Sequence, residues 1–140
     1  MVYGLNLRIM VCGSIGYGGI NEIRSLYSFL RNEGFEVLDH IENKGMDYSD
    51  VKDFRDKKEL SREIVEHDLT HVKKADILVV LADTPSQGTA IEAFVGKKEE
   101  KKIILFVKDP MPSPWLVNFS DYIVSNQKEL VELLHKIHSK

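Results

Sequence analysis

Two short apolar runs constrain the fold of this chain more than any other feature of its sequence. Ile77–Ala82 reads ILVVLA and Ile103–Val107 reads IILFV, and neither run contains a polar residue. A strand with one buried face alternates apolar and polar side chains, so uninterrupted runs of this kind are typical of strands buried on both faces. Such strands occur mainly in parallel sheets covered by helices on both sides. The two runs therefore predict the α/β class.

Extended and helical patterns alternate along the rest of the chain. The predicted strands are 7–12, 35–41, 77–82, 103–107 and 122–124, and the predicted helices are 21–33, 58–74, 88–99 and 127–137. With right-handed crossovers, this order predicts a flavodoxin-like (Rossmann-like) three-layer sandwich whose five-stranded parallel sheet has the order 2-1-3-4-5. We expect segment 42–57 to be a loop, and the proline-containing segment 109–114 to be an irregular loop. Residues 1–140 are expected to form a single domain.

Composition and charge narrow the function. A net charge of -3 argues against binding to a nucleic acid polymer through bulk charge. No apolar run approaches the roughly 20 residues of a membrane-spanning helix, so we expect no membrane partner. The start of the sequence lacks the pattern of a signal peptide, and the single cysteine, Cys12, cannot form an internal disulfide. We therefore expect a cytoplasmic protein.

A glycine-rich segment follows the first predicted strand. Residues 12–19 read CGSIGYGG and lead into a predicted helix. Backbone N–H groups at such a helix start favour a phosphate or a carboxylate. The spacing of the glycines matches neither the dinucleotide-binding motif nor the P-loop. The segment therefore predicts binding of an anion or a sugar, and its alternative interpretation is a turn that needs glycine for its backbone dihedrals.

A second segment, 86–92, follows the most buried strand and reads SQGTAIE. Glu92 is expected in the first turn of the next helix, at the sheet edge where ligands of such folds bind. A structural alternative exists, because Thr89-x-x-Glu92 has the spacing of a capping box. Asp83 and Ser86 flank the same turn, and each is either a ligand-binding or an ordinary turn residue. The segment thus predicts a catalytic carboxylate or a helix cap.

The third segment, EHDLTH, lies in the helix predicted at 58–74. His67 and His71 share a helix face at the spacing of two metal ligands, but only His40 offers itself as a third ligand. We therefore expect no metal, and interpret the histidines as a polar face. Asp68 and Glu92 remain as two carboxylates near a glycine-rich loop. Two carboxyl groups are the smallest set of residues that can cleave a glycosidic bond. One group attacks the sugar carbon, and the other assists the leaving group.

Several motifs occur in a fixed order along nearly the whole chain: Cys12–Ile15 (CGSI), Asp39-His40, Glu66–Leu69 (EHDL), Ala75-Asp76, Pro85–Glu92 (PSQGTAIE), Lys101–Phe106 (KKIILF) and Ser113. In this order they resemble the nucleoside 2-deoxyribosyltransferase superfamily, and most of all its 2′-deoxynucleoside 5′-phosphate N-hydrolase branch. The resemblance implies the same flavodoxin-like fold. It also implies an N-glycosidase that needs no metal and no cofactor.

The resemblance assigns roles to individual residues. Glu92 matches the nucleophile that forms a covalent ester with the sugar at C1′, and Asp68 matches the group that handles the proton of the leaving base. Ser14 and Ser86, with the amides of the glycine-rich loop, match the 5′-phosphate site. Ser113 matches a serine that reaches this phosphate from the neighbouring subunit, which implies a homodimer with shared sites. The implied substrate contacts are Cys12, Gly13, Ser14, Ile15, Gly16, Tyr17, Gly18, Gly19, His40, Ser86, Gly88 and Ser113.

Two positions depart from the family pattern. The hydrolase branch carries an arginine in its glycine-rich loop, whereas in this chain no arginine lies between Cys12 and Arg24. A tyrosine that the family carries two residues before the cysteine is Met10 here. We expect hydrolysis of a (2′-deoxy)nucleoside 5′-monophosphate to free base and (deoxy)ribose 5-phosphate. The alternatives are transfer of deoxyribose between free bases and a non-catalytic nucleotide-binding module. A phosphoribohydrolase of the lysine-decarboxylase-like group is disfavoured, because it needs PGG where this chain has PSQ.

Overall fold

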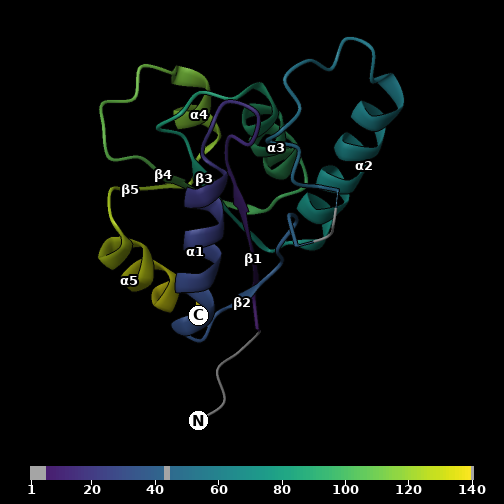
Figure 1. Ribbon diagram of the computed structural model, residues 1–140. Coiled ribbons are helices and arrows are strands. Elements are labelled where there is room, and N and C mark those ends of the chain that lie inside the picture. The colour runs from purple at the N-terminus through teal and green to yellow at the C-terminus, as the bar shows by residue number, and fades with distance from the viewer. Residues whose placement is uncertain (1–5, 43–44, 140) are drawn as a thin grey trace.

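A computed structural model describes residues 6–42 and 45–139 and shows a five-stranded parallel sheet of order β2-β1-β3-β4-β5 (Figure 1). The α/β class and the predicted strand order are confirmed. The predicted domain 1–140 and the predicted loop 42–57 include residues 1–5, 43–44 and 140, which lie outside the described residues. The elements are β1 (Arg8–Cys12), α1 (Ile20–Asn32), β2 (Glu36–Val37), α2 (Lys58–Lys74), β3 (Ile77–Leu81), α3 (Gln87–Lys98), β4 (Lys102–Phe106), α4 (Pro114–Phe119), β5 (Tyr122–Val124) and α5 (Gln127–His138).

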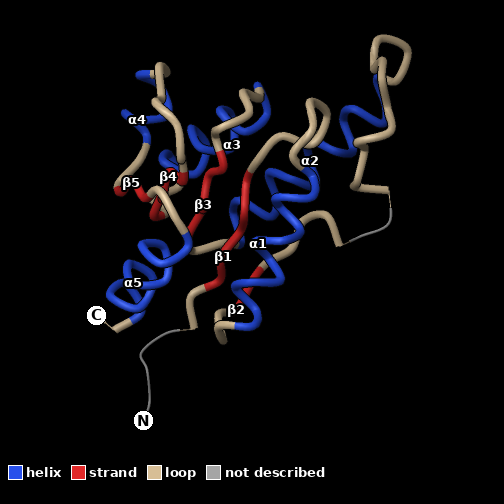
Figure 2. The backbone as a smooth tube through the Cα atoms, turned by 60° about the vertical axis from the view of Figure 1, so that its left-hand side comes forward, coloured by secondary structure: helices blue, strands red, loops and turns tan. Residues whose placement is uncertain are grey.

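Helices cover both faces of the sheet (Figure 2). Their apolar side chains form two separate hydrophobic cores with those of the strands. Because side chains alternate along a strand, Ile9 and Val11 pack in the core beneath α1 and α5. Met10 and Cys12 point the other way, into the core that α2, α3 and α4 cover. Gly96 lets α3 approach the sheet, since a Cβ at this position would lie 2.4 Å from the side chain of Leu78. The end of β1 therefore belongs to the α2–α4 side of the molecule.

Two details of the predicted elements are wrong. The strand predicted at 35–41 ends at Val37, because the carboxylate of Asp39 accepts a hydrogen bond from the backbone N–H of Ile41 and turns the chain. The proline-containing loop is followed by an unpredicted helix, α4, in which Pro114 occupies the first turn. A helix of six residues is too short to show a helical period in the sequence. Among the described residues, no helix combines the length and the apolar character that crossing a membrane requires.

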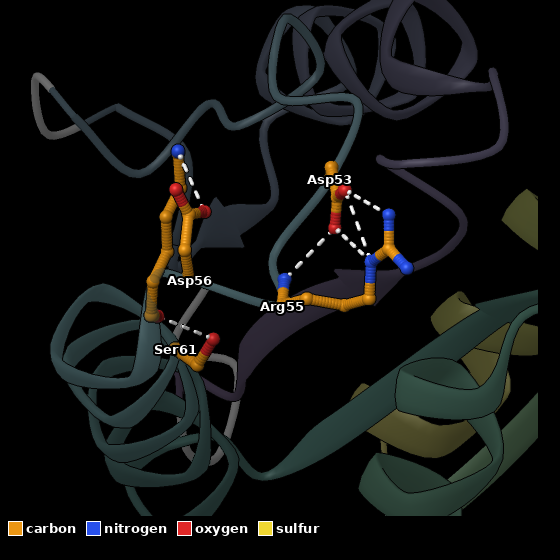
Figure 3. A network of polar contacts seen from close by, with 5 residues as sticks. Asp53, Arg55, Asp56 and Ser61 are labelled. Atoms are coloured by element: carbon orange, nitrogen blue, oxygen red, sulfur yellow. Dashed lines mark hydrogen bonds and ion pairs between the residues drawn. The ribbon is translucent and has the colours of Figure 1, made fainter.

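The described part of the predicted loop, 45–57, contains neither helix nor strand, and polar contacts organise its end (Figure 3). The carboxylate of Asp53 accepts hydrogen bonds from the guanidinium of Arg55, at 2.8 Å from Nη2, and from the backbone N–H of the same residue at 2.9 Å. The hydroxyl of Ser61 donates to the carbonyl of Lys57 at 2.8 Å. Exposed ion pairs stabilise little, but these contacts fix where the chain enters α2.

Candidate active site

A cavity of about 120 Å³ lies beyond the carboxyl ends of β1 and β3, where the strand order reverses. Ligands of doubly wound sheets bind at this kind of position. The cavity brings together several residues predicted from the sequence: Gly13, Ile15, His40, Asp68, Ser86, Gly88 and Glu92. The rest of its wall comes from Tyr48, Ile64, Val65, Leu69, Thr89 and Ile91. The two candidate carboxylates therefore share one cavity although they come from different helices, α2 and α3.

Glu92 lies in the second turn of α3, and not in the first turn as expected, because the helix begins at Gln87. The N-cap is Ser86, whose hydroxyl oxygen accepts a hydrogen bond from the backbone N–H of Thr89 at 3.3 Å. The capping box predicted between Thr89 and Glu92 is therefore wrong. Glu92 is only 7% exposed, and the structural alternative of a capping glutamate does not explain its burial.

The electrostatics of the cavity favour protonated carboxyl groups. Burial raises the pKa of Glu92 well above its usual range, the charge of Asp68 raises it further, and a hydrogen bond with the thiol of Cys12 partly opposes the rise. Burial also raises the pKa of Asp68 to about 7. Two buried carboxyl groups that interact in this way titrate as a pair. At a pH below about 7 Asp68 is mostly protonated, so it can supply an acid beside Glu92.

Cys12 is fully buried at the end of β1, beneath Glu92, and does not line the cavity. Burial raises the pKa of its thiol, and the charges of Glu92 and Asp68 raise it further. A neutral thiol is a poor nucleophile, so Cys12 is not a candidate nucleophile. The direct substrate contact that the resemblance implies for this side chain is not open to it in this structure.

The backbone of the glycine-rich loop requires glycine at one of its positions, and the other loop residues differ in their exposure. The hydroxyl oxygen of the buried Ser14 accepts a hydrogen bond from the backbone N–H of Tyr17 at 3.2 Å. Gly19 has a φ of +122°, and a Cβ there would lie 2.8 Å from the carbonyl oxygen of Ser14. Gly16, Tyr17 and Gly18 are exposed, and Tyr17 lines a shallow groove with residues 84–87 instead of the cavity. At Gly19 the alternative interpretation, a turn that requires glycine, is therefore confirmed.

The two departures from the family pattern have clear structural consequences. Arg24, the first arginine after the loop, forms an ion pair with Asp47, with 2.8 Å between Nη2 and Oδ2. Met10 is fully buried in the core beneath α2 and α3, and it is not part of the cavity wall. Neither residue places a polar group in the cavity, so the polar part of the wall comes from the residues named above.

His40 follows β2 and is 1% exposed in the cavity wall. Its Nδ1 lies 2.9 Å from the hydroxyl of Tyr27, and burial, together with His71 and His67, lowers the pKa of the imidazole to about 3. The ring of His40 is therefore neutral at physiological pH. Nε2 of His67 donates to the carbonyl of His40 at 2.9 Å, and Nδ1 of His71 bonds to the carbonyl of His67 at 3.0 Å. These histidines position the chain after β2.

No group of three or more histidine, cysteine or acidic side chains suited to a metal ion occurs within residues 6–42 and 45–139. A larger cavity of about 740 Å³ lies on the opposite face of the sheet, where Leu81 and Phe106 meet the start of α5. It contains neither Asp68 nor Glu92, so its walls lack the pair of buried carboxyl groups. The smaller cavity is therefore the candidate active site.

The predicted subunit-contact residues lie outside both cavities. Ser113 is the N-cap of α4 and is partly exposed. Trp115 is 70% exposed, so this side chain does not fill the end of the sheet. Other exposed apolar side chains lie on the same side of the molecule, on α2, α3 and α4: Val65, Ile91, Phe94 and Val117.

Sequence reasoning missed two polar residues of the cavity wall. Tyr48 comes from the loop before α2, where no periodic pattern marks it, and burial and the two carboxylates raise the pKa of its phenol. Thr89 is 3% exposed and lies one helical turn before Glu92. A signal for Thr89 was available, since residues three apart share a helix face.

Solved structures of other proteins share this fold, among them the following three. A 2-deoxyribosyltransferase from the psychrotolerant bacterium Bacillus psychrosaccharolyticus has a TM-score of 0.69 and 18% identity, with 88% of this chain and 89% of that chain covered. The CMP N-glycosidase BcmB of Clostridium botulinum has a TM-score of 0.57 and 20% identity, with coverages of 91% and 98%. A conserved protein from Enterococcus faecalis V583 has a TM-score of 0.74 and 16% identity, with coverages of 94% and 99%.

Comparisons of the sequence itself give no match, either to a protein-family model or to a curated protein. At identities of 16 to 20%, the structural likeness concerns the fold. The chain therefore has the flavodoxin-like fold of a 2-deoxyribosyltransferase and of a CMP N-glycosidase, in agreement with the fold that the sequence motifs implied.

Proposed function

We propose that this protein hydrolyses the N-glycosidic bond of a nucleoside 5′-monophosphate, and in particular of a 2′-deoxynucleotide. The observation that carries the proposal is the pair of carboxyl groups, the buried Glu92 and the half-buried Asp68, which line one cavity at the switch point of the sheet and have raised pKa values. A carboxyl pair of this kind matches the chemistry of glycosidic bonds. Two proteins of the same fold, a deoxyribosyltransferase and a CMP N-glycosidase, act on such bonds according to their names.

In the first step, the carboxylate of Glu92 attacks C1′ while the bond between C1′ and the base nitrogen breaks. Asp68 in its protonated form donates its proton to the departing base, and a sugar ester of Glu92 remains. The positive charge that develops at C1′ favours the ionised form of Glu92 at this moment, although burial favours the protonated form in the free site.

In the second step, Asp68 accepts a proton from water, and the resulting hydroxide attacks the ester at C1′. The products are (deoxy)ribose 5-phosphate and free Glu92, while Asp68 is protonated again for the next cycle. A single carboxyl group thus serves as the acid in one step and as the base in the other. A pKa of about 7 suits both roles near neutral pH.

The size of the cavity fits the sugar better than a whole nucleotide. Pockets for drug-sized ligands span about 300–1,000 Å³, whereas this cavity measures about 120 Å³. The base and the phosphate would therefore extend from its rim. Ser86 lies at the start of α3, where the helix dipole favours an anion, and its hydroxyl proton is free to be donated while its oxygen caps the helix.

A second candidate function is the transfer of deoxyribose from a free nucleoside to another base. The observation that favours it is that Arg24, the first arginine after the glycine-rich loop, is paired with Asp47. Transfer and hydrolysis share the ester of Glu92 and differ in whether a base or water receives the sugar.

We also propose that the protein acts as a homodimer in the cytoplasm. The partner that fits the exposed apolar side chains of α2, α3 and α4 is a second copy of this chain, since the molecule already exposes Trp115, Phe94 and Ile91 on one side. Ser113 directly precedes α4, so a symmetric contact through this helix would carry it toward the partner's cavity. The single buried cysteine fits a reducing compartment.

The experiment that tests the proposed function incubates the purified protein with a panel of nucleosides and nucleoside 5′-monophosphates. Free base and sugar phosphate are separated by chromatography, with and without a second base as acceptor. Base release from a 2′-deoxynucleoside 5′-monophosphate in water alone is the expected result. Release that depends on an acceptor base would support transfer, and no release from any compound would overturn both enzymatic functions.

A further inference from the structure

One buried hydroxyl group in the cavity wall has no partner. Among residues 6–42 and 45–139, Oγ1 of Thr89 is the only buried side-chain oxygen or nitrogen atom without a hydrogen bond. Thr89 is 3% exposed and lines the cavity that contains Glu92 and Asp68. A buried hydroxyl without a partner costs free energy, so its presence calls for an explanation.

Other hydroxyl residues of this protein show the usual way to avoid this cost. A serine or threonine in a helix can donate to the carbonyl four residues earlier. Thr70 donates to the carbonyl of Glu66 at 2.7 Å, and Ser61 donates to the carbonyl of Lys57 at 2.8 Å. Thr89 is only the third residue of α3, so the residue four positions earlier, Pro85, lies before the N-cap, and this usual bond is not open to the hydroxyl of Thr89. The hydroxyl is thus left without a partner in the wall of the cavity.

The position of Thr89 along α3 indicates what this is. Ser86, Thr89 and Glu92 are spaced three residues apart and all line the same cavity. Residues at this spacing lie on one helix face, about 5–6 Å apart at their Cβ atoms. If Glu92 faces C1′ and Ser86 faces the phosphate, Thr89 faces the part of the sugar between them.

We propose that Thr89 is a sugar-recognition residue, whose hydroxyl donates a hydrogen bond to the 3′-hydroxyl of the substrate's ribose or deoxyribose. The proposal rests on the proposed function for the identity of the ligand. The free protein keeps an unsatisfied hydroxyl, and the bound sugar satisfies it. Recognition of this kind rejects a sugar without the 3′-hydroxyl, because the buried group of the protein then stays unpaired.

The first test needs no ligand. Thr89→Val replaces the hydroxyl with a methyl group of similar size, and should raise the melting temperature by about 2–6 °C, because an unpaired polar atom leaves the interior. Thr70→Val is the matched control, since this helical threonine is exposed and its hydroxyl is already bonded. It should leave the melting temperature unchanged or lower it slightly. A lower melting temperature for Thr89→Val would overturn the proposal, since the hydroxyl would then be satisfied in the free protein.

The second test measures binding in a Glu92→Gln background, which prevents turnover. Calorimetry compares the four 2′-deoxynucleoside 5′-monophosphates with their 2′,3′-dideoxy counterparts. Loss of the 3′-hydroxyl should weaken binding about tenfold with Thr89 present and hardly at all with Thr89→Val. Thr89→Ser keeps a hydroxyl and should restore most of the discrimination.

The outcomes separate this proposal from the proposed function. If the 2′-deoxynucleotides bind and Thr89→Val leaves the tenfold discrimination intact, the role of Thr89 is overturned and the proposed function stands. If none of the nucleotides binds while the wild type also releases no base from them, the proposed function fails, and the sugar-recognition role fails with it.

Discussion

Asp68→Asn should change the pH dependence of stability in a way that the structure specifies. Burial raises the pKa of Asp68 from 3.8 to about 7 in the folded protein. The folded state therefore binds this proton more tightly than the unfolded state does. The resulting stability is fully present below about pH 4 and is lost as the pH rises through 7. Asparagine has no proton to lose, so the variant escapes this loss.

The magnitude follows from the size of the change in pKa. One pKa unit corresponds to about 1.36 kcal/mol, so a change from 3.8 to about 7 sets an upper bound of about 4 kcal/mol. Asp68 keeps partial contact with solvent, which screens part of this cost. The part of this change that falls between pH 5 and pH 8 is about 2–3 kcal/mol before screening. In this range the wild type should therefore lose about 1–2 kcal/mol of unfolding free energy relative to Asp68→Asn.

Urea denaturation followed by circular dichroism at pH 5 and pH 8 measures this difference. Asp53→Asn is a suitable control, because Asp53 is exposed and Arg55 lowers its pKa, so that it stays ionised over the whole range. This control should follow the wild type. Parallel pH profiles for the wild type and Asp68→Asn would refute the burial of an ionisable group at this position.

Two further predictions concern the phosphate and the dimer. Ser86→Ala should raise the KM for a 2′-deoxynucleoside 5′-monophosphate about ten- to a hundredfold, because it removes one hydrogen bond to a charged group, and should hardly affect a free nucleoside. Because Ser86 also caps α3, the melting temperature of the Ser86→Ala variant must be measured too. Equal losses of activity on the nucleotide and on the free nucleoside would mean that Ser86 only caps the helix and does not bind the phosphate. Trp115→Ala and Val117→Glu, both at exposed positions of α4, should each give monomers in sedimentation and lose activity together. A fully active monomeric wild type at micromolar concentration would contradict the shared site.

The fold could be predicted because its strongest signals are local. The run Ile77–Ala82 can bury its apolar side chains on both faces only between two layers of helices. The alternation of strands and helices along the chain then leaves few possible topologies. The same topology places residues that follow β1 and β3 at one sheet edge. The proximity of Asp68 and Glu92 followed from this placement together with the family resemblance.

The remaining details depend on competition between similar local signals. Ser86 and Thr89 are both good N-cap residues, and the sequence does not show which one begins α3. The choice moves Glu92 from the first turn to the second and leaves the hydroxyl of Thr89 inside the cavity. The early end of β2 likewise depends on one side-chain turn at Asp39. Tyr48 reaches the cavity from a loop, where no sequence period indicates a direction.

The central claim is that Glu92 attacks the sugar, and the rate of base release by Glu92→Gln tests it most directly. Glutamine has the same shape and keeps its hydrogen-bonding oxygen, but it cannot form the sugar ester. With a 2′-deoxynucleoside 5′-monophosphate as substrate, the variant should fold normally and release base several orders of magnitude more slowly than the wild type. A folded variant that retains more than about a tenth of wild-type activity would contradict the claim, because losing covalent catalysis costs far more than that.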